Sequence, residues 1–89
     1  MKTSFYDKVL HTGDNWKITR AMHGTAALND WKVWQHDKHV GSINKSSDGY
    51  DTSVILWDNT LSDDFGGPIT IKYLKDAIQA VKDFMNDNG

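Results

Sequence analysis

Cysteine is absent from this chain of 89 residues, and proline occurs only once. The chain can therefore form no disulfide framework, on which small secreted domains usually depend, and this favours a reducing compartment. No apolar run follows the first four residues, so no signal peptide is predicted. The longest apolar run, residues 54–57, is far shorter than the roughly 18 residues that a membrane span requires. We expect a cytoplasmic protein with no membrane partner.

Glutamate is also missing, because all twelve acidic residues are aspartate. Aspartate favours turns and helix caps over helix interiors, which suits a chain with much loop and little helix. The net charge of −2 is too small for a DNA-mimic inhibitor, but it hides an uneven distribution. Residues 16–45 hold five cations and two acids, whereas residues 46–71 hold five acids and no cation. Such segregation affects which surface of the protein meets which partner.

The composition is otherwise that of an ordinary globular domain, with 38% apolar and 25% charged residues. The length fits one domain with a modest core, to which four Trp, three Tyr and three Phe contribute much of the buried area. We therefore predict a single domain over residues 1–89, with its core over about 5–86 and a frayed tail at 87–89.

The C-terminal segment has the pattern of an amphipathic helix. Apolar residues recur at spacings of three and four, and polar residues occupy the opposite side. The apolar stripe consists of Ile71, Leu74, Ile78, Val81 and Met85, widened by Ala77 and Phe84. With Thr70 as its N-cap, the helix is expected to run from about residue 71 to residue 86.

The preceding residues show the alternation and composition of strands. Strands are predicted over residues 16–19, 31–36, 39–43 and 50–57, with a hairpin turn at Asp37-Lys38 and loops at 24–30 and 58–68. Residues 4–10 fit either a short helix, capped by Ser4 and ended by Gly13, or an extended arm, and the helix is the preferred interpretation. The predicted fold class is α+β, an antiparallel sheet of about four strands packed on one C-terminal helix.

Geometry predicts that one face of this sheet stays uncovered. Four strands span about 19 Å, whereas a helix with its side chains is about 10–12 Å wide. The side chains expected to point towards the helix are those of Trp16, Ile18, Met22, Trp31 and Val33. The side chains expected on the opposite, uncovered face are those of Lys17, Thr19, His23, Lys32, Trp34 and His36. The uncovered face is thus polar enough to be exposed to water and apolar enough to bind a partner.

No sequence pattern indicates catalysis or a cofactor. The chain has no Gly-x-Ser-x-Gly elbow, no Walker lysine and no Gly-x-Gly-x-x-Gly segment. His36 and His39 match no zinc motif. A calcium loop starting at residue 58 would need Gly and Glu where Asp63 and Ile69 stand. We predict a protein that is not an enzyme and binds no metal and no cofactor.

The preferred functional hypothesis is a non-catalytic protein-binding module. Many small phage and mobile-element inhibitors act by occluding a partner's surface, and the comparison with them rests on small size and the lack of chemical motifs alone. The expected partner-binding residues are Lys32, Trp34 and His36 on the uncovered face, and Asp63 and Asp64 in the acidic loop.

The alternative hypothesis is a single-stranded nucleic-acid binder that uses the same face. In that case Trp34 would stack on a base, and nearby cations would meet phosphates. The cations concerned are Lys17, Arg20, Lys32 and Lys45. A twofold homodimer, formed through two uncovered faces or two sheet edges, is compatible with the preferred hypothesis.

Overall fold

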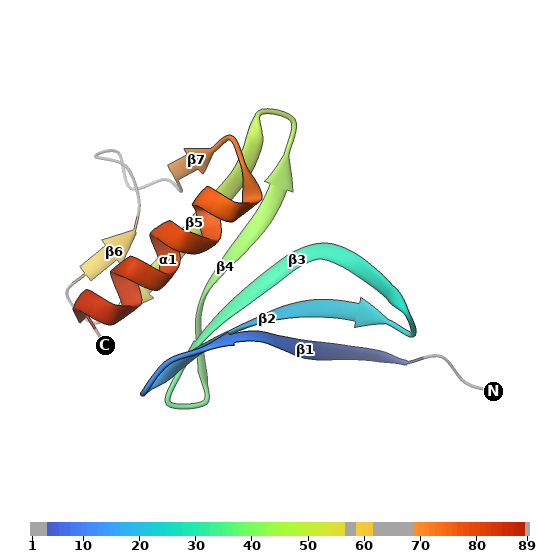
Figure 1. Cartoon of the computed structure of the whole chain (residues 1–89), viewed down its shortest axis with the longest axis horizontal. Coiled ribbons are helices and arrows are strands. Elements are labelled where there is room, and N and C mark those ends of the chain that lie inside the picture. Colours follow the sequence, from blue (N-terminus) through green and yellow to red (C-terminus); the bar gives the residue numbers. More distant parts are fainter. Residues whose placement is uncertain (1–3, 57–58, 62–68, 89) are drawn as a thin grey trace.

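The computed structural model describes residues 4–56, 59–61 and 69–88, which form an antiparallel sheet and one C-terminal helix (Figure 1). The elements are β1 (Phe5–Thr12), β2 (Trp16–His23), β3 (Ala26–Gln35), β4 (Lys38–Ser46), β5 (Gly49–Leu56), β6 (Asn59–Leu61), β7 (Ile69–Ile71) and α1 (Leu74–Asn88). The strands are ordered β1-β2-β3-β4-β5-β6, and β7 also pairs with β5. The predicted α+β class is confirmed.

Strands β1 to β5 form a meander of consecutive hairpins. The hairpin between β3 and β4 closes with Gln35 opposite Lys38, so its turn residues are His36 and Asp37. Both have positive φ angles, of 50° and 64°. Two consecutive residues with positive φ give the turn the twist of a type I′ hairpin, which suits the right-handed twist of the strands. The predicted hairpin is confirmed, with its turn one residue earlier than expected.

The prediction of about four strands is wrong, since the described residues form seven. The preferred N-terminal helix is also wrong, because residues 5–12 form β1 and pair with β2. A seven-residue helix gains few internal hydrogen bonds for its nucleation cost, whereas pairing with β2 satisfies the backbone along the strand. The predicted loop at 24–30 is wrong from Ala26 onward, where β3 begins in a stretch of low strand propensity.

The helix starts later than its apolar pattern suggests. Residues 69–71 pair with β5, and α1 begins at Leu74. Thr70 is therefore no N-cap, and its hydroxyl donates a hydrogen bond of 2.8 Å to Asp51 Oδ1. The helix ends at Asn88, two residues beyond its predicted end at residue 86.

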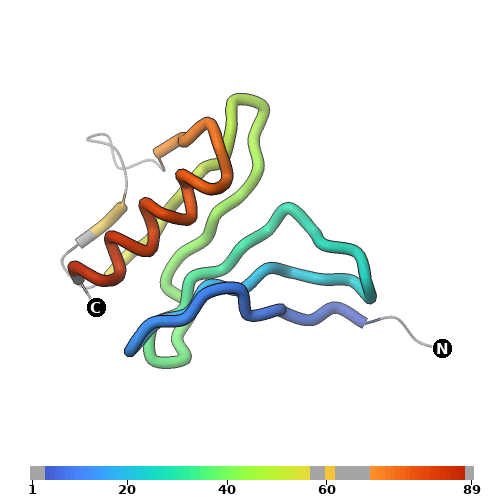
Figure 2. The backbone as a smooth tube through the Cα atoms, in the orientation of Figure 1, coloured from blue at the N-terminus to red at the C-terminus, as the bar shows by residue number. Residues whose placement is uncertain are grey.

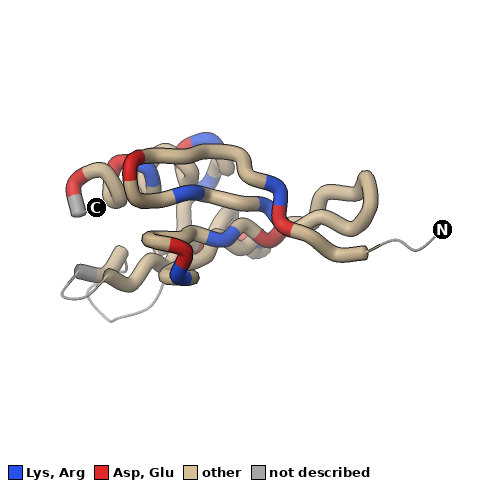
Figure 3. The backbone as a smooth tube through the Cα atoms, turned by 90° about the horizontal axis from the view of Figure 1, so that it is seen from below, with Lys and Arg blue, Asp and Glu red and all other residues tan. Residues whose placement is uncertain are grey.

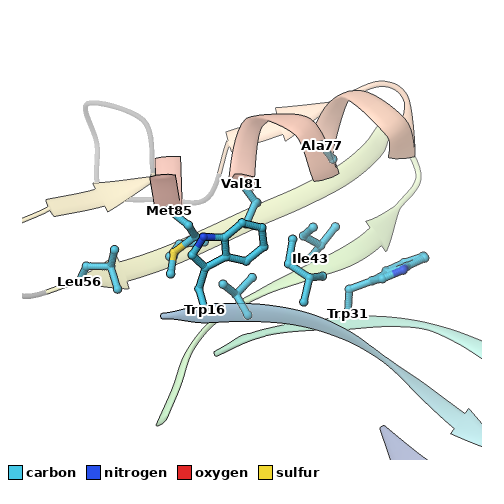
Figure 4. Packing of buried hydrophobic residues seen from close by; sticks show 10 residues of the cluster. Trp16, Trp31, Ile43, Leu56, Ala77, Val81 and Met85 are labelled. Atoms are coloured by element: carbon cyan, nitrogen blue, oxygen red, sulfur yellow. The ribbon is translucent and has the colours of Figure 1, made fainter. Parts of the chain in front are cut away.

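The core lies between α1 and one face of the sheet, here called the inner face. Helix side chains Ala77, Val81 and Met85 have no exposed surface and meet β5, β4 and β2 side chains (Figure 4). The five residues predicted to point inward, Trp16, Ile18, Met22, Trp31 and Val33, are all at most 8% exposed. That assignment is confirmed, and Ile43 joins them as a fully buried residue of β4.

The helix covers only part of the inner face. It packs mainly against β5, with further contacts to β6 and β7. The far ends of β1, β2 and β3 extend away from α1 (Figure 2). We call residues 5–9, 20–23 and 26–30 the sheet arm. The opposite, outer face carries no second layer of helix or strand from the described part of the chain.

Candidate functional site

Strand β1 is an edge strand that carries unusually many exposed apolar side chains. Among the described strands it pairs only with β2. The exposed fractions are 71% for Phe5, 49% for Tyr6, 49% for Val9 and 37% for Leu10. In the described part of the chain only Ile55 and Tyr73 are other large apolar residues with such exposure. Large apolar side chains that gather on one exposed strand are typical of an interaction site.

The backbone of β1 presents hydrogen-bonding groups to the open edge. The Gly24 N–H donates to the Ser4 carbonyl across a distance of 3.4 Å, so these two residues form a hydrogen-bonded pair. In an antiparallel ladder, hydrogen-bonded and non-hydrogen-bonded pairs alternate along the strand. The N–H and C=O groups of Phe5, Asp7 and Val9 therefore point away from β2, and no described strand lies beyond them.

A bulge and two charges limit the usable stretch of this edge. The register with β2 shifts between Val9 and His11, which confines the regular part to residues 5–9. Asp7 Oδ2 lies 3.5 Å from Lys32 Nζ on the outer face. The side chain of Lys8 points to the inner face, opposite Arg20, and is exposed. Figure 3 shows an acidic position next to a basic one in the strand that leads from the N-terminus.

Trp34 lies on the outer face and is partly buried by its own neighbours. Its Nε1 donates a hydrogen bond of 2.9 Å to Thr19 Oγ1, and Thr19 is only 2% exposed. Lys17 Nζ lies 5.6 Å from the centroid of the Trp34 ring, within cation–π range. The His39 ring is tilted against it, with the ring centroids 5.2 Å apart. The indole N–H is thus already used, while part of the ring stays accessible.

The predicted partner-binding residues fall in three places. Lys32 and Trp34 share the outer face of β3, where Lys32 pairs with Asp7. His36 is an exposed turn residue at the end of that strand. Asp63 and Asp64 lie outside the described residues. Sequence reasoning missed Phe5 and Val9, because residues 5–10 show no apolar-polar alternation and no local signal prefers a strand there.

The hairpin tip borders a hollow of about 570 Å³. It opens where the pairing of β4 with β5 ends, at Gly41 and Val54. Its lining includes His36, Lys38 and His39 together with the apolar Val40, Ile55 and Leu56. Nowhere in the described ranges do three or more His, Cys, Asp or Glu side chains come close enough to hold a metal ion.

No protein-family model matches the chain, and no curated protein or solved structure shows significant similarity to it. The one helix of the described residues is neither long nor apolar enough to cross a membrane. The geometry of the sheet is therefore the basis for assigning a function.

Proposed function

We propose that the chain is a non-catalytic protein-binding module that occupies a partner's surface through its edge strand β1. One observation carries this proposal: free backbone groups and exposed apolar side chains coincide on residues 5–9. Strand addition to a sheet edge uses both, because main-chain hydrogen bonds give affinity and alternate side chains give specificity.

The energetic cost of leaving apolar side chains exposed favours a role for Phe5 and Val9 in contacts with another molecule. Covering a large apolar side chain contributes roughly 1.5–3 kcal/mol, and a small domain has little stability to spare. Phe5 and Val9 forgo much of this contribution in the free protein, since 71% and 49% of their surfaces are exposed. A partner strand that pairs with Phe5, Asp7 and Val9 would place its own side chains beside both of these and bury part of their exposed surface.

Site-specific photo-crosslinking tests this proposal. A photoreactive phenylalanine analogue replaces Val9 in one variant and Gln79 in the other, because Gln79 lies on the exposed side of α1. In an extract of the source cells, position 9 should yield adducts with a second protein, and an excess of unlabelled chain should suppress them. Position 79 should yield none. Equal labelling from both positions, or no adduct from position 9, would contradict docking at β1.

A second candidate function, single-stranded nucleic-acid binding, is favoured by the surroundings of Trp34. The ring lies on the outer face with Lys17 Nζ at 5.6 Å, and Lys32 is two residues away in the same strand. Base stacking on such a ring would be supported by phosphate contacts from the two lysines. Against it, both lysines face carboxylates of the chain itself, with Lys17 Nζ 3.8 Å from Asp37 Oδ1 and Lys32 Nζ 3.5 Å from Asp7 Oδ2.

Tryptophan fluorescence decides this second candidate. Oligothymidylate should quench the fluorescence at about 50 mM salt and lose its effect as salt rises, because phosphate contacts weaken with ionic strength. The comparison is made in a Trp57→Phe background, because Trp57 lies outside the described residues. There, the further change Trp34→Phe should abolish the quenching, since Trp16 and Trp31 are buried. Unchanged fluorescence of the unmodified chain at low salt would eliminate the nucleic-acid hypothesis.

A further inference from the structure

We propose that the strand received by β1 comes from a different protein, runs antiparallel to β1, and places an acidic side chain opposite Lys8 and apolar side chains opposite Phe5 and Val9. This inference rests on the proposed docking function of β1 and specifies its partner. It is drawn from the register of β1, the charges along it and the direction of its free backbone groups.

A second copy of the chain fits this edge poorly. In a twofold dimer that continues the sheet, the register that uses Phe5, Asp7 and Val9 of both copies sets Asp7 directly opposite Asp7. A shift to the next register sets Lys8 opposite Lys8. Like charges in directly opposed positions destabilise strand pairing. Registers centred nearer either end avoid these contacts, but they leave Phe5 or Val9 outside the mutual pairing.

The charges near Lys8 call for an acid on the inner face. Lys8 stands opposite Arg20 in the register of β1 with β2, so two cations are direct cross-strand neighbours. The Arg20 guanidinium is held by the Leu28 carbonyl at 2.7 Å and lies 4.5 Å from the Trp31 ring centroid. Neither cation has an acidic partner among the described residues. An acidic side chain opposite Lys8 would supply the missing counter-ion.

On the outer face, the partner strand needs apolar or neutral side chains instead of an acidic one. Asp7 already has a counter-ion, because Lys32 Nζ lies 3.5 Å from its carboxylate. A residue opposite Asp7 therefore needs no charge. On either side of it, Phe5 and Val9 point to the same outer face and are exposed, so the residues opposite them gain most by being apolar. The partner strand thus has an apolar residue opposite Val9, an acidic residue opposite Lys8 and a neutral residue opposite Asp7.

A pair of blocked peptides tests this inference on the full-length chain. The first is acetyl-Thr-Val-Glu-Thr-Val-Tyr-Thr-amide, and the second carries Lys in place of Glu. Each is titrated into isotope-labelled protein to millimolar concentration, with amide chemical shifts and amide hydrogen exchange as readouts. The Glu peptide should shift the β1 resonances, slow exchange at Phe5, Asp7 and Val9, and bind about three- to tenfold more tightly than the Lys peptide.

The Lys8→Glu variant completes the cycle, because Lys8 is exposed and its replacement should leave the fold intact. This variant should prefer the Lys peptide by a similar factor. Equal affinities in all four combinations would overturn the charge requirement, as would the absence of β1 shifts with either peptide. Concentration-dependent sedimentation of the chain as a dimer, with protected β1 amides, would make the second copy the occupant and also overturn the inference. The proposed function is tested independently by the photo-crosslinking experiment, and it is contradicted if the photoreactive residue at position 9 captures no second protein.

Discussion

The part of the sheet beneath α1 and the sheet arm use the same kinds of residue in opposite ways. Between the helix and the sheet, Val54 of β5 and Val81 and Met85 of α1 have no exposed surface. On the arm, Phe5 and Val9 expose 71% and 49% of their surfaces. Apolar side chains thus contribute to stability in the first region and remain available for contacts with other molecules in the second. One continuous sheet combines a stable support with an exposed edge.

The cause of this difference is the ratio of helix to sheet. Six neighbouring strands span about 29 Å, whereas α1 with its side chains is about 10–12 Å wide. The helix packs over β5 and its neighbours on the inner face and does not reach β1, and Phe5 and Val9 point to the outer face, which no described element covers. The sequence-based width argument assumed about four strands, and with seven strands the mismatch becomes larger.

Side-chain truncations in the two regions should show the largest contrast. Met85→Ala removes a fully buried side chain from the contact between α1 and the sheet, so we expect a loss of about 2–5 kcal/mol in the free energy of unfolding. Val9→Ala, on the exposed edge, should change it by no more than about 0.5 kcal/mol. Urea denaturation followed by tryptophan fluorescence measures both. Similar losses would mean that β1 is covered in solution and would break the comparison.

Gly41 tests how closely β4 and β5 approach beneath the helix. A Cβ at this position would collide with the Ser53 carbonyl oxygen and lie 2.7 Å from Val54 Cα. Because both are backbone atoms, the strands would have to separate, and Gly41→Ala should cost about 1–3 kcal/mol. The control is Ser42→Ala, one residue further along β4, which should cost less than about 0.5 kcal/mol. Equal urea midpoints for the two variants would contradict this close approach.

The regular patterns made the core predictable. The apolar spacing of α1 and the alternation in β2 and β3 identified Val81, Met85, Trp16 and Trp31 as buried residues. These residues alternate or repeat because one side of each element faces the core. The start of α1 was not predictable in this way, because Ile71 continues the helical spacing while its backbone pairs with Tyr50 of β5.

The edge and the short strands were missed because nothing local determines them. Residues 4–10 contain a plausible helix cap and no apolar-polar alternation, and only pairing with β2 selects the strand. Strands β6 and β7 have three residues each, too few for a clear pattern, and β7 forms only by pairing with residues of β5 that lie 17–21 positions earlier. The candidate site depends on β1 being a strand at an edge, so it was hidden together with that element.

The β3–β4 turn offers the smallest and most selective change, since it adjusts stability without touching β1. His36 and Asp37 both adopt positive φ, a conformation that Asn and Gly accept more readily in a type I′ turn. His36→Asn combined with Asp37→Gly should therefore raise the free energy of unfolding by about 0.5–1 kcal/mol, after the added unfolded-state entropy of glycine. The ion pair lost with Asp37 matters little, because that side chain is 95% exposed and 3.8 Å from Lys17 Nζ. Asp37→Ala is the control, since it loses the same ion pair and keeps a Cβ at positive φ, so it should not stabilise.

If hydrogen exchange at Phe5, Asp7 and Val9 stays as fast in the stabilised double variant as in the unmodified chain, these amides exchange from the folded protein. Slower exchange in step with the added stability would instead mean that they exchange only on unfolding, and that the β1 edge is protected.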